Sequence, residues 1–403
     1  MKKILIILWT IIIVGIIFIT YSLLFSSPAA DTPLSKLEKI SRKATSTDTL
    51  DTTAKKTYGE YLDAGNKYFD EENYTLAATN YKYAAATNEN LEILIKLGES
   101  YLHDNQYEKS KSTFQKAEKL KPDSLAIKLG EIKSFLGLRD IENAKTLIWS
   151  LDPNTPEIKY YRAVVLILYK EFNESQKLFS ELTTQTEPQP DQKIIDNAQK
   201  FVDRYVTFNY FKESSPLFLE TMLAKTMTEV NENGTAIPLL YDVLSTQANY
   251  RDAWIILGYA YLKTGQSTDA IDALNRAKDL DPEKSETLFY LGLAYYANND
   301  TEKAIHYIEE AEKKGYPTKD LINLKLGELY AIQGKYRTAE KKYEQVIALN
   351  PSDINLFVKA IWMNIEKIGD AEKAISLADK AIASFPNDPM SYNLKGWALT
   401  ANE

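Results

Sequence analysis

The sequence predicts an all-α fold in which helix hairpins stack into a solenoid. The first observation is a pattern of large and small apolar residues that returns every 33 to 35 residues, a period typical of solenoid repeats. The second is the spacing inside each unit, since Trp254, Leu257 and Tyr261 are three and four residues apart and share one helical face. The third is that Gly265 suits the end of one helix and Pro282 cannot continue the next. A single hairpin cannot bury its own apolar face, so the units must stack.

The N-terminus carries a long apolar segment. Residues 4–25 contain no charged side chain, and 22 residues are enough to cross a bilayer as a helix. Trp9 and Tyr21 lie near its ends, where amphipathic rings favour the membrane interface, and the two lysines before it favour a cytoplasmic N-terminus. The segment predicts a signal-anchor over residues 1–25, in a single-pass membrane protein with its N-terminus cytoplasmic and its body extracytoplasmic.

Two alternatives remain open for this segment. One is a cleaved signal peptide, since residues 27–29 offer small side chains at a cleavage site, although the apolar run exceeds the roughly 7–15 residues usual for that role. The other is the opposite orientation, because four basic residues that prefer the cytoplasm follow the segment, at Lys36, Lys39, Arg42 and Lys43. Long domains, however, cross a membrane largely regardless of such charge.

The remaining chain divides into two arrays of repeats. Residues 26–57 are rich in Ser, Thr, Asp and Lys and predict a flexible linker. An N-terminal array follows at 58–183 and a C-terminal array occupies 217–403, which gives about nine repeats in all. Between them, a linker at 184–216 begins with a proline-containing breaker and predicts a long helix over 191–211. The sequence closes on one more first-helix pattern, which either caps the stack or belongs to an incomplete repeat.

Residues 251–284 resemble one repeat of the tetratricopeptide repeat (TPR) family, whose pattern is W-x2-L-G-x2-Y, then A-x3-F-x2-A, then P. The resemblance is carried by Trp254, Leu257, Gly258, Tyr261, Ala270, Leu274, Ala277 and Pro282. Further copies are carried by Leu94, Leu97, Gly98, Tyr101, Phe114, Ala117 and Pro122, and by Leu291, Gly292, Tyr295, Ala304, Ile308 and Ala311. With its apolar N-terminus, the chain resembles membrane-anchored TPR proteins of bacterial envelopes. The resemblance implies a TPR helix-hairpin solenoid behind one N-terminal transmembrane helix.

Composition argues against several classes of function. The chain has no cysteine, which rules out disulfides, zinc-thiolate sites and thiol nucleophiles. Its net charge of −8 disfavours nucleic-acid binding, which needs basic patches. No phosphate-binding loop, nucleophile elbow or metalloprotease motif occurs, and repeats account for nearly all residues from Tyr58 onward. We therefore expect no enzymatic activity, no cofactor, no metal site and no nucleic-acid partner.

The resemblance implies where a partner binds, because positions 2, 5, 9, 12 and 13 of TPR first helices face a concave groove. The large apolar residues at such positions are Ile255, Tyr259, Phe289, Leu293, Tyr296, Leu324, Val358 and Trp362. An exposed apolar patch of this kind marks an interaction site, and aromatic residues are the usual anchors of binding energy. The alternative is that these side chains pack between neighbouring helices, and it weighs most for Leu293 and Leu324.

The predicted function is a membrane-tethered scaffold that binds a protein or peptide with an apolar segment in this groove. The resemblance suggests assembly of an envelope complex as its setting. An alternative is a structural protein that self-associates as a homo-oligomer, through the groove or through the final helix. An enzyme hidden in the array is less favoured.

Overall fold

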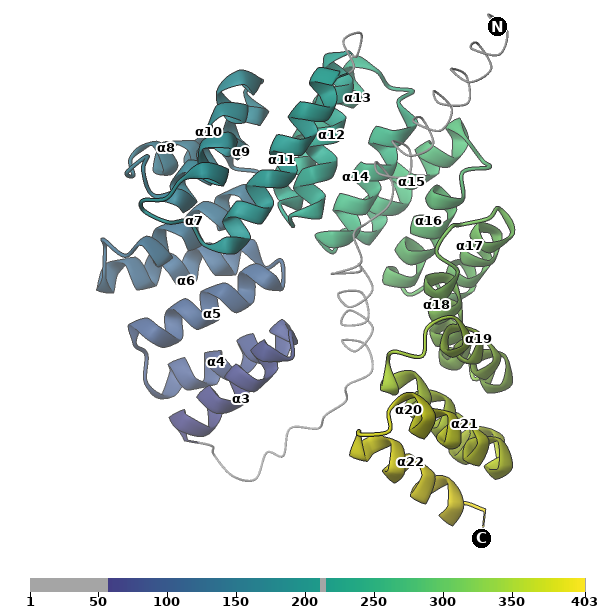
Figure 1. Cartoon of the computed structure of the whole chain (residues 1–403). Helices are drawn as coiled ribbons and strands as arrows, with labels where there is room; N and C mark the ends of the chain where they lie inside the picture. The colour runs from purple at the N-terminus through teal and green to yellow at the C-terminus, as the bar shows by residue number, and fades with distance from the viewer. Residues whose placement is uncertain (1–56, 211–214, 403) are drawn as a thin grey trace, which may run out of the picture. The chain divides into compact units, whose positions relative to one another are not determined.

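The computed structural model describes residues 57–210 and 215–402, which form twenty α-helices and one π-helix and contain no β-strand (Figure 1). The all-α prediction is thereby confirmed for this part of the chain. The helices before residue 211 are α3 (Tyr58–Asp70), α4 (Tyr74–Thr87), α5 (Leu91–His103), α6 (Tyr107–Leu120), α7 (Leu125–Gly137), α8 (Ile141–Trp149), α9 (Pro156–Leu168), α10 (Phe172–Thr184) and α11 (Gln192–Tyr210).

The helices after residue 214 are α12 (Pro216–Glu229), α13 (Asn233–Thr246), α14 (Arg251–Lys263), α15 (Ser267–Leu280), α16 (Ser285–Ala297), α17 (Thr301–Lys313), α18 (Lys319–Ile332), α19 (Tyr336–Leu349), α20 (Ile354–Met363), the π-helix η1 (Asn364–Ile368), α21 (Ala371–Ser384) and α22 (Pro389–Thr400). Consecutive helices pack as hairpins, and α5 contacts α7, α12 contacts α14 and α14 contacts α16, as stacked repeats require. We call α3–α10 the first array and α12–α22 the second array.

Small residues in the first helices let the two helices of each hairpin approach closely. At Gly292 in α16, an added Cβ atom would lie 2.5 Å from the Ile308 side chain and 3.0 Å from the Ala304 carbonyl oxygen of α17. Because interiors are close-packed, that space cannot accept another atom without movement of the second helix. The sequence pattern predicted a glycine at this contact, and Gly292 is therefore required for the close packing of α16 on α17.

Replacing Gly292 by valine is expected to destabilise the chain by about 1–3 kcal/mol, the usual cost of overpacking a core. The measurement is urea unfolding followed by circular dichroism. Gly396→Val is the matched control, since Gly396 lies at the same position of α22 and has no atom within 4 Å of an added Cβ. Equal midpoints for the two variants would contradict the packing role of Gly292.

The π-helix η1 accommodates one extra residue. Ala270 lies twelve positions after Gly258 in the α14–α15 hairpin, whereas Ala374 lies thirteen positions after Ile361, the corresponding residue of the α20–α21 hairpin. A π-turn inserts one residue without ending the helix. The turn thereby keeps α21 in register with α20.

The long helix predicted between the arrays is α11, and it is more than a spacer. It buries Phe201 and Tyr205, and the Phe201 ring stacks on Phe179 of α10 with centroids 4.3 Å apart. The Tyr205 hydroxyl donates to Ser175 Oγ, also of α10, at 3.0 Å. With its further contacts to α9 and α12, α11 continues the packing of the first array.

Contacts between distant repeats join the two arrays. Helix α13 packs against α7 and α9, although three or more helices lie between them in the sequence. At Gly234, the second residue of α13, an added Cβ would lie 2.7 Å from the Leu136 carbonyl oxygen and 2.9 Å from the Gly137 Cα of α7. Only glycine permits two backbones to come this close. We call this contact the junction.

Polar side chains complete the junction along one edge of the first array. They come from three turns between first and second helices, each at a residue with positive φ. Asn105 donates to the Lys263 carbonyl oxygen (3.2 Å), Arg139 donates to Gln266 (2.5 Å), and Lys170 forms ion pairs with Glu220 (3.5 Å) and Asp242 (3.9 Å). The first array supplies the positive charges and the second array the negative ones, so the surfaces are complementary.

Glu232, in the turn before α13, gives the junction a pH dependence. Burial raises the pKa of its carboxyl group, and the attraction of Lys133 and the hydrogen bond from Tyr161 oppose that shift only in part. Since the folded chain then holds this proton more tightly than the unfolded chain, the contribution of Glu232 to stability falls as pH rises from the unfolded pKa through the folded pKa.

We expect Glu232→Gln to raise the Tm at pH 7 by about 2–4 °C, because glutamine is uncharged and still accepts a hydrogen bond. The difference in Tm from the parent chain should shrink as pH falls from the folded pKa of Glu232 to the pKa of an unfolded glutamate, below which both states are protonated. Thermal melts between pH 4 and pH 8 measure it, with the exposed Glu302→Gln as control. If the Tm difference between Glu232→Gln and the parent chain stayed constant from pH 4 to pH 8, the raised pKa assigned to Glu232 would be wrong.

The predicted localisation is corrected by the structure. No helix within residues 57–210 and 215–402 is long and apolar enough to cross a membrane. This finding contradicts the single-pass assignment with an extracytoplasmic body, which we do not retain. The predicted helix 4–25 itself lies outside the described residues, as does the linker up to residue 56.

Candidate protein-binding surface

The eight residues predicted to bind a partner lie on four first helices of the second array. They are Ile255 and Tyr259 on α14, Phe289, Leu293 and Tyr296 on α16, Leu324 on α18, and Val358 and Trp362 on α20. Three of them, Ile255, Phe289 and Leu293, are only 5%, 2% and 3% exposed. These three side chains pack between helices, as the alternative interpretation held for Leu293. Of the other five, four are partly exposed and Trp362 is exposed.

An aromatic cluster lies between α14 and α16, and we define it as Tyr259, Phe289, Tyr290 and Tyr316. Tyr316 belongs to the segment between α17 and α18. The ring centroids of Tyr259 and Tyr290 are 5.2 Å apart, and the Phe289 ring stacks on Tyr316 at 4.4 Å. Phe289 is buried, whereas the three tyrosines are partly exposed. The cluster therefore presents three tyrosines on a buried phenylalanine base.

Burial raises the pKa values of the three tyrosines in this cluster. It raises the pKa of Tyr259 to about 12, with the charge of Glu229 as a second cause. Burial is also the main reason that the pKa values of Tyr290 and Tyr316 lie above the ordinary value, and the carboxylate of Glu286 adds to both shifts. The three phenols therefore stay protonated at neutral pH, where each hydroxyl can both donate and accept a hydrogen bond.

A band of charged residues, Lys325 and Glu328 on α18 and Lys359 on α20, lies beside Tyr296 of α16. The buried Lys325 has its Nζ 5.7 Å from the ring centroid of Tyr296 and 2.6 Å from a carboxylate oxygen of Glu328. Glu328 also lies 3.6 Å from Lys359 of α20. A buried charge is tolerated when it is paired, and this pairing accounts for the position of Lys325. A partner crossing the band would meet Tyr296 beside paired charges.

Trp362 on α20 is the most exposed predicted residue, at 38%. Lys367 of η1 lies over its ring, with Nζ 5.2 Å from the centroid. A cation above an indole face is a favourable contact, which restrains the orientation of the ring. Trp362 thus offers an oriented apolar surface next to a positive charge.

The exposed aromatic and charged side chains on these first helices are suited to binding another protein. Tyrosine combines a large ring with a hydroxyl and loses little conformational entropy when it is fixed, so tyrosine-rich surfaces suit protein and peptide partners. Across residues 57–210 and 215–402, no group of three or more His, Cys, Asp or Glu residues could hold a metal ion.

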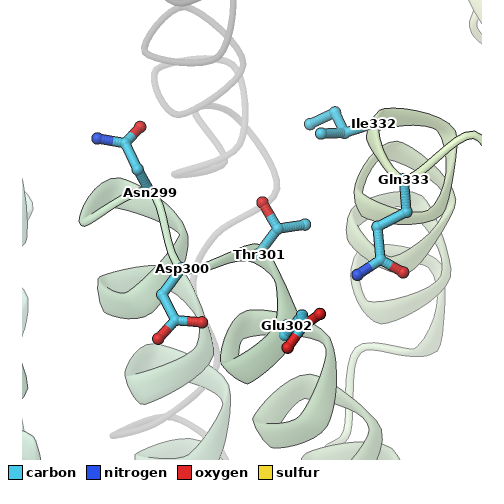
Figure 2. Close-up of a pocket in the computed structure, with 6 residues that line it drawn as sticks. All are labelled: Asn299, Asp300, Thr301, Glu302, Ile332 and Gln333. Carbon is cyan, nitrogen blue, oxygen red and sulfur yellow. The ribbon is translucent and has the colours of Figure 1, made fainter.

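Two hollows lie elsewhere, on the second and first arrays. One of about 590 Å³ is shown in Figure 2 and is lined by Asn299, Asp300, Thr301, Glu302, Ile332 and Gln333. Another of about 520 Å³ is lined by Asn154, Lys159, Glu181, Thr184, Gln185, Glu187 and Pro188. Neither contains any of the eight predicted residues. Both are shallow and open, so we place the candidate surface on the first helices instead.

Sequence reasoning missed two members of the aromatic cluster. Tyr290 directly follows a predicted residue, Phe289, and occupies a position that the repeat pattern does not assign to the groove. Tyr316 lies outside the helices, after Gly315, whose φ of 77° turns the chain. The only sequence signal for it is an aromatic residue between a glycine and a proline, in a segment that the repeat pattern leaves undefined.

Models of known protein families match parts of the two arrays in which the sequence predicted repeats. The family model described as TPR repeat matches residues 258–299, and models described as tetratricopeptide repeat match residues 289–354 and 91–124. The first two matched ranges include Tyr259, Tyr290 and Tyr316. The candidate surface is therefore built on TPR helices and on the connection between two of them.

Several proteins are similar to parts of this chain. Anaphase-promoting complex subunit 3 of Schizosaccharomyces pombe is 23% identical over 265 residues, which is 66% of this chain and 36% of that protein. The human protein O-mannosyl-transferase TMTC1 is 27% identical over 139 residues, 34% of this chain and 15% of that protein. The chain thus spans only a minor part of either relative. The crystal structure of MamA is 24% identical and covers 40% of this chain and 93% of its own, with a TM-score of 0.37.

Neither the structure nor these similarities identify the chain as membrane-anchored or as a bacterial-envelope protein. The helix hairpins, their repeat period and the matched family models support the same conclusion about the architecture. The chain contains tetratricopeptide repeats, with family matches at residues 91–124 and 258–354.

Proposed function

We propose that this chain is a scaffold that binds a protein or peptide partner on the first helices of its second array. The observation that carries the proposal is the aromatic cluster, in which Tyr259, Tyr290 and Tyr316 remain accessible within the part of the chain that matches TPR models. A surface that served only packing would bury these rings, as it buries Phe289.

The chemistry of the surface indicates the kind of partner. Apolar or aromatic side chains of a partner would contact the tyrosine rings, while the hydroxyl groups would bond to its backbone. The paired charges around Glu328 would contact its polar flank, and the ring of Trp362 would contact a further apolar side chain. An extended peptide or an amphipathic helix with an apolar segment satisfies these requirements.

We propose the assembly of a larger protein complex as the setting of this binding, of which an envelope complex is one form. The proposal makes the chain a binding protein and not an enzyme. The human relative named as a transferase matches over 15% of its own length, so its named activity is not carried over. Membrane tethering forms no part of this proposal.

A peptide-display selection against the full chain tests the proposal. Affinities of the selected peptides would be measured by fluorescence anisotropy, and their binding site by hydrogen exchange. We expect bound peptides to protect amides of α14, α16 and the α17–α18 connection. Protection confined to the second helices or to the first array would overturn the assignment of the site.

A further inference from the structure

The junction buries two acceptor atoms to which no described group donates a hydrogen bond. Asn233, the first residue of α13, is 7% exposed, and Glu220 of α12 is 3% exposed. Neither Asn233 Oδ1 nor Glu220 Oε2 accepts a hydrogen bond of normal geometry from the described residues, although Lys170 Nζ lies 3.5 Å from Glu220. A buried acceptor without a hydrogen bond costs stability, and water would bond to both atoms if the junction opened. Both atoms therefore weaken the closed junction.

Glu232 is the titratable group at the centre of this contact. The ionisable groups that act on it, or on which it acts, come from four helices and are Tyr107 of α6, Lys133 of α7, Tyr160 and Tyr161 of α9, and Lys193 of α11. The two lysines and the hydrogen bond from Tyr161 favour the carboxylate, yet burial outweighs them and raises the pKa of Glu232. The closed junction therefore holds a proton on Glu232 more tightly than an open junction would.

The junction is rich in polar contacts, whereas the hairpins pack through apolar side chains. Phe179 of α10 and Phe201 of α11, for example, stack on each other and are fully buried. At the junction, the side chains of Asn105, Arg139 and Lys170 contact the second array. A polar contact is cheap to break in water, because water takes over its hydrogen bonds, and parts joined in this way commonly move relative to each other. The junction can therefore open while the hairpins stay packed.

We propose that the junction is a latch, which opens while both arrays stay folded and which a proton on Glu232 holds closed. In the closed latch, α13 packs on α7 and α9, and Gly234 meets the backbone of α7. In the open latch, α13 leaves α7, water reaches Asn233 and Glu220, and the Glu232 carboxylate is hydrated. The first array then turns relative to the second.

The direction of the pH effect follows from the protonation of Glu232 in the two states. An exposed glutamate has a pKa of about 4.3, whereas burial raises the pKa of Glu232 in the closed latch. Below about pH 4 both states carry the proton, so this group does not affect the equilibrium there. Between the two pKa values the ratio of open to closed latch rises by up to about tenfold per pH unit, and above the raised pKa it stays constant. A rise in pH therefore opens the latch.

Fluorescence energy transfer between the arrays tests the proposal in the full chain. Because the chain has no cysteine, Gln115→Cys on α6 and Asp272→Cys on α15 supply two unique thiols for dyes, and both positions are exposed. The turns before α6 and α15 meet in the closed latch, where Asn105 donates to the Lys263 carbonyl oxygen. We therefore expect transfer to fall as pH rises from about 4 to 8, with the helix content unchanged by circular dichroism.

Two variants of the dye-labelled chain separate the causes. Glu232→Gln should keep transfer high across the pH range, because an amide has no such proton to lose, whereas the exposed Glu302→Gln should leave the fall unchanged. Asn233→Leu removes a buried acceptor and should raise the ratio of closed to open latch at pH 8 by about tenfold. Its control is Asn173→Leu, since Asn173 is exposed in the first turn of α10.

Three results would overturn the latch. The first is transfer that does not change with pH, and the second is a fall with pH that Glu232→Gln leaves intact. The third is a loss of helix content that accompanies the loss of transfer, since the chain would then unfold instead of opening at the junction.

Discussion

Replacing Tyr259 and Tyr290 together by alanine is expected to weaken partner binding by about a hundredfold or more, because buried aromatic anchors each contribute about 2 kcal/mol or more to an interface. Both rings lie at the accessible part of the aromatic cluster, with centroids 5.2 Å apart. Phe289 is left intact because it is buried, and its removal would confound lost binding with lost packing.

The measurement is the Kd of a selected peptide by fluorescence anisotropy, with circular dichroism to confirm that helix content is unchanged. Tyr83→Ala is the matched control, since Tyr83 is an exposed tyrosine on a second helix of the first array. Replacing Tyr259 and Tyr290 by phenylalanine keeps the rings and removes the hydroxyls, so a loss of about tenfold would measure the hydrogen bonds alone. Unchanged affinity in the double alanine variant would exclude the cluster as the site.

Replacing Gly234 by valine is expected to break the junction and to destabilise the folded chain by about 3 kcal/mol, the upper end of the cost of overpacking. The new Cβ would lie within 3 Å of two backbone atoms, the Leu136 carbonyl oxygen and the Gly137 Cα. Backbone cannot rotate away as a flexible side chain does, so α13 must separate from α7. The ion pairs of Lys170 would be lost with it.

Two measurements check this result. Urea unfolding should show a lower midpoint, and small-angle scattering of the folded variant should show a larger radius of gyration. Gly59→Val serves as control, because the nearest atom to its added Cβ, Thr57 Oγ1, is 4.0 Å away. A variant with unchanged midpoint and unchanged radius would contradict the close contact between α13 and α7.

The hairpins could be predicted because their packing is encoded locally. The contact of Gly292 with Ile308 joins two helices that are adjacent in sequence, and the repeat period predicts it directly. The contact of Gly234 with Gly137 joins residues about a hundred positions apart, and no local pattern signals it.

The candidate surface was predicted only in part, for a similar reason. A position in the repeat shows that Tyr259 and Phe289 point to the same side of the array, but exposure depends on the neighbouring element. Tyr316 covers Phe289, and Tyr316 belongs to a connection whose conformation the helical period does not determine. Which of the eight residues stay accessible therefore followed from tertiary packing. Their role in binding a partner stays a prediction.

The junction has a mechanical consequence. A solenoid whose repeats touch only their neighbours behaves as a spring, because bending is spread over many small displacements. Here α13 ties the chain back to α7 and α9, so the segment from α7 to α13 forms a closed loop of contacts. Bending within this loop would require the rupture of the Lys170 ion pairs and of the backbone contact at Gly234. Elastic extension under load would therefore begin in the repeats from α16 onward, which carry Tyr290 and Tyr316 of the proposed binding surface.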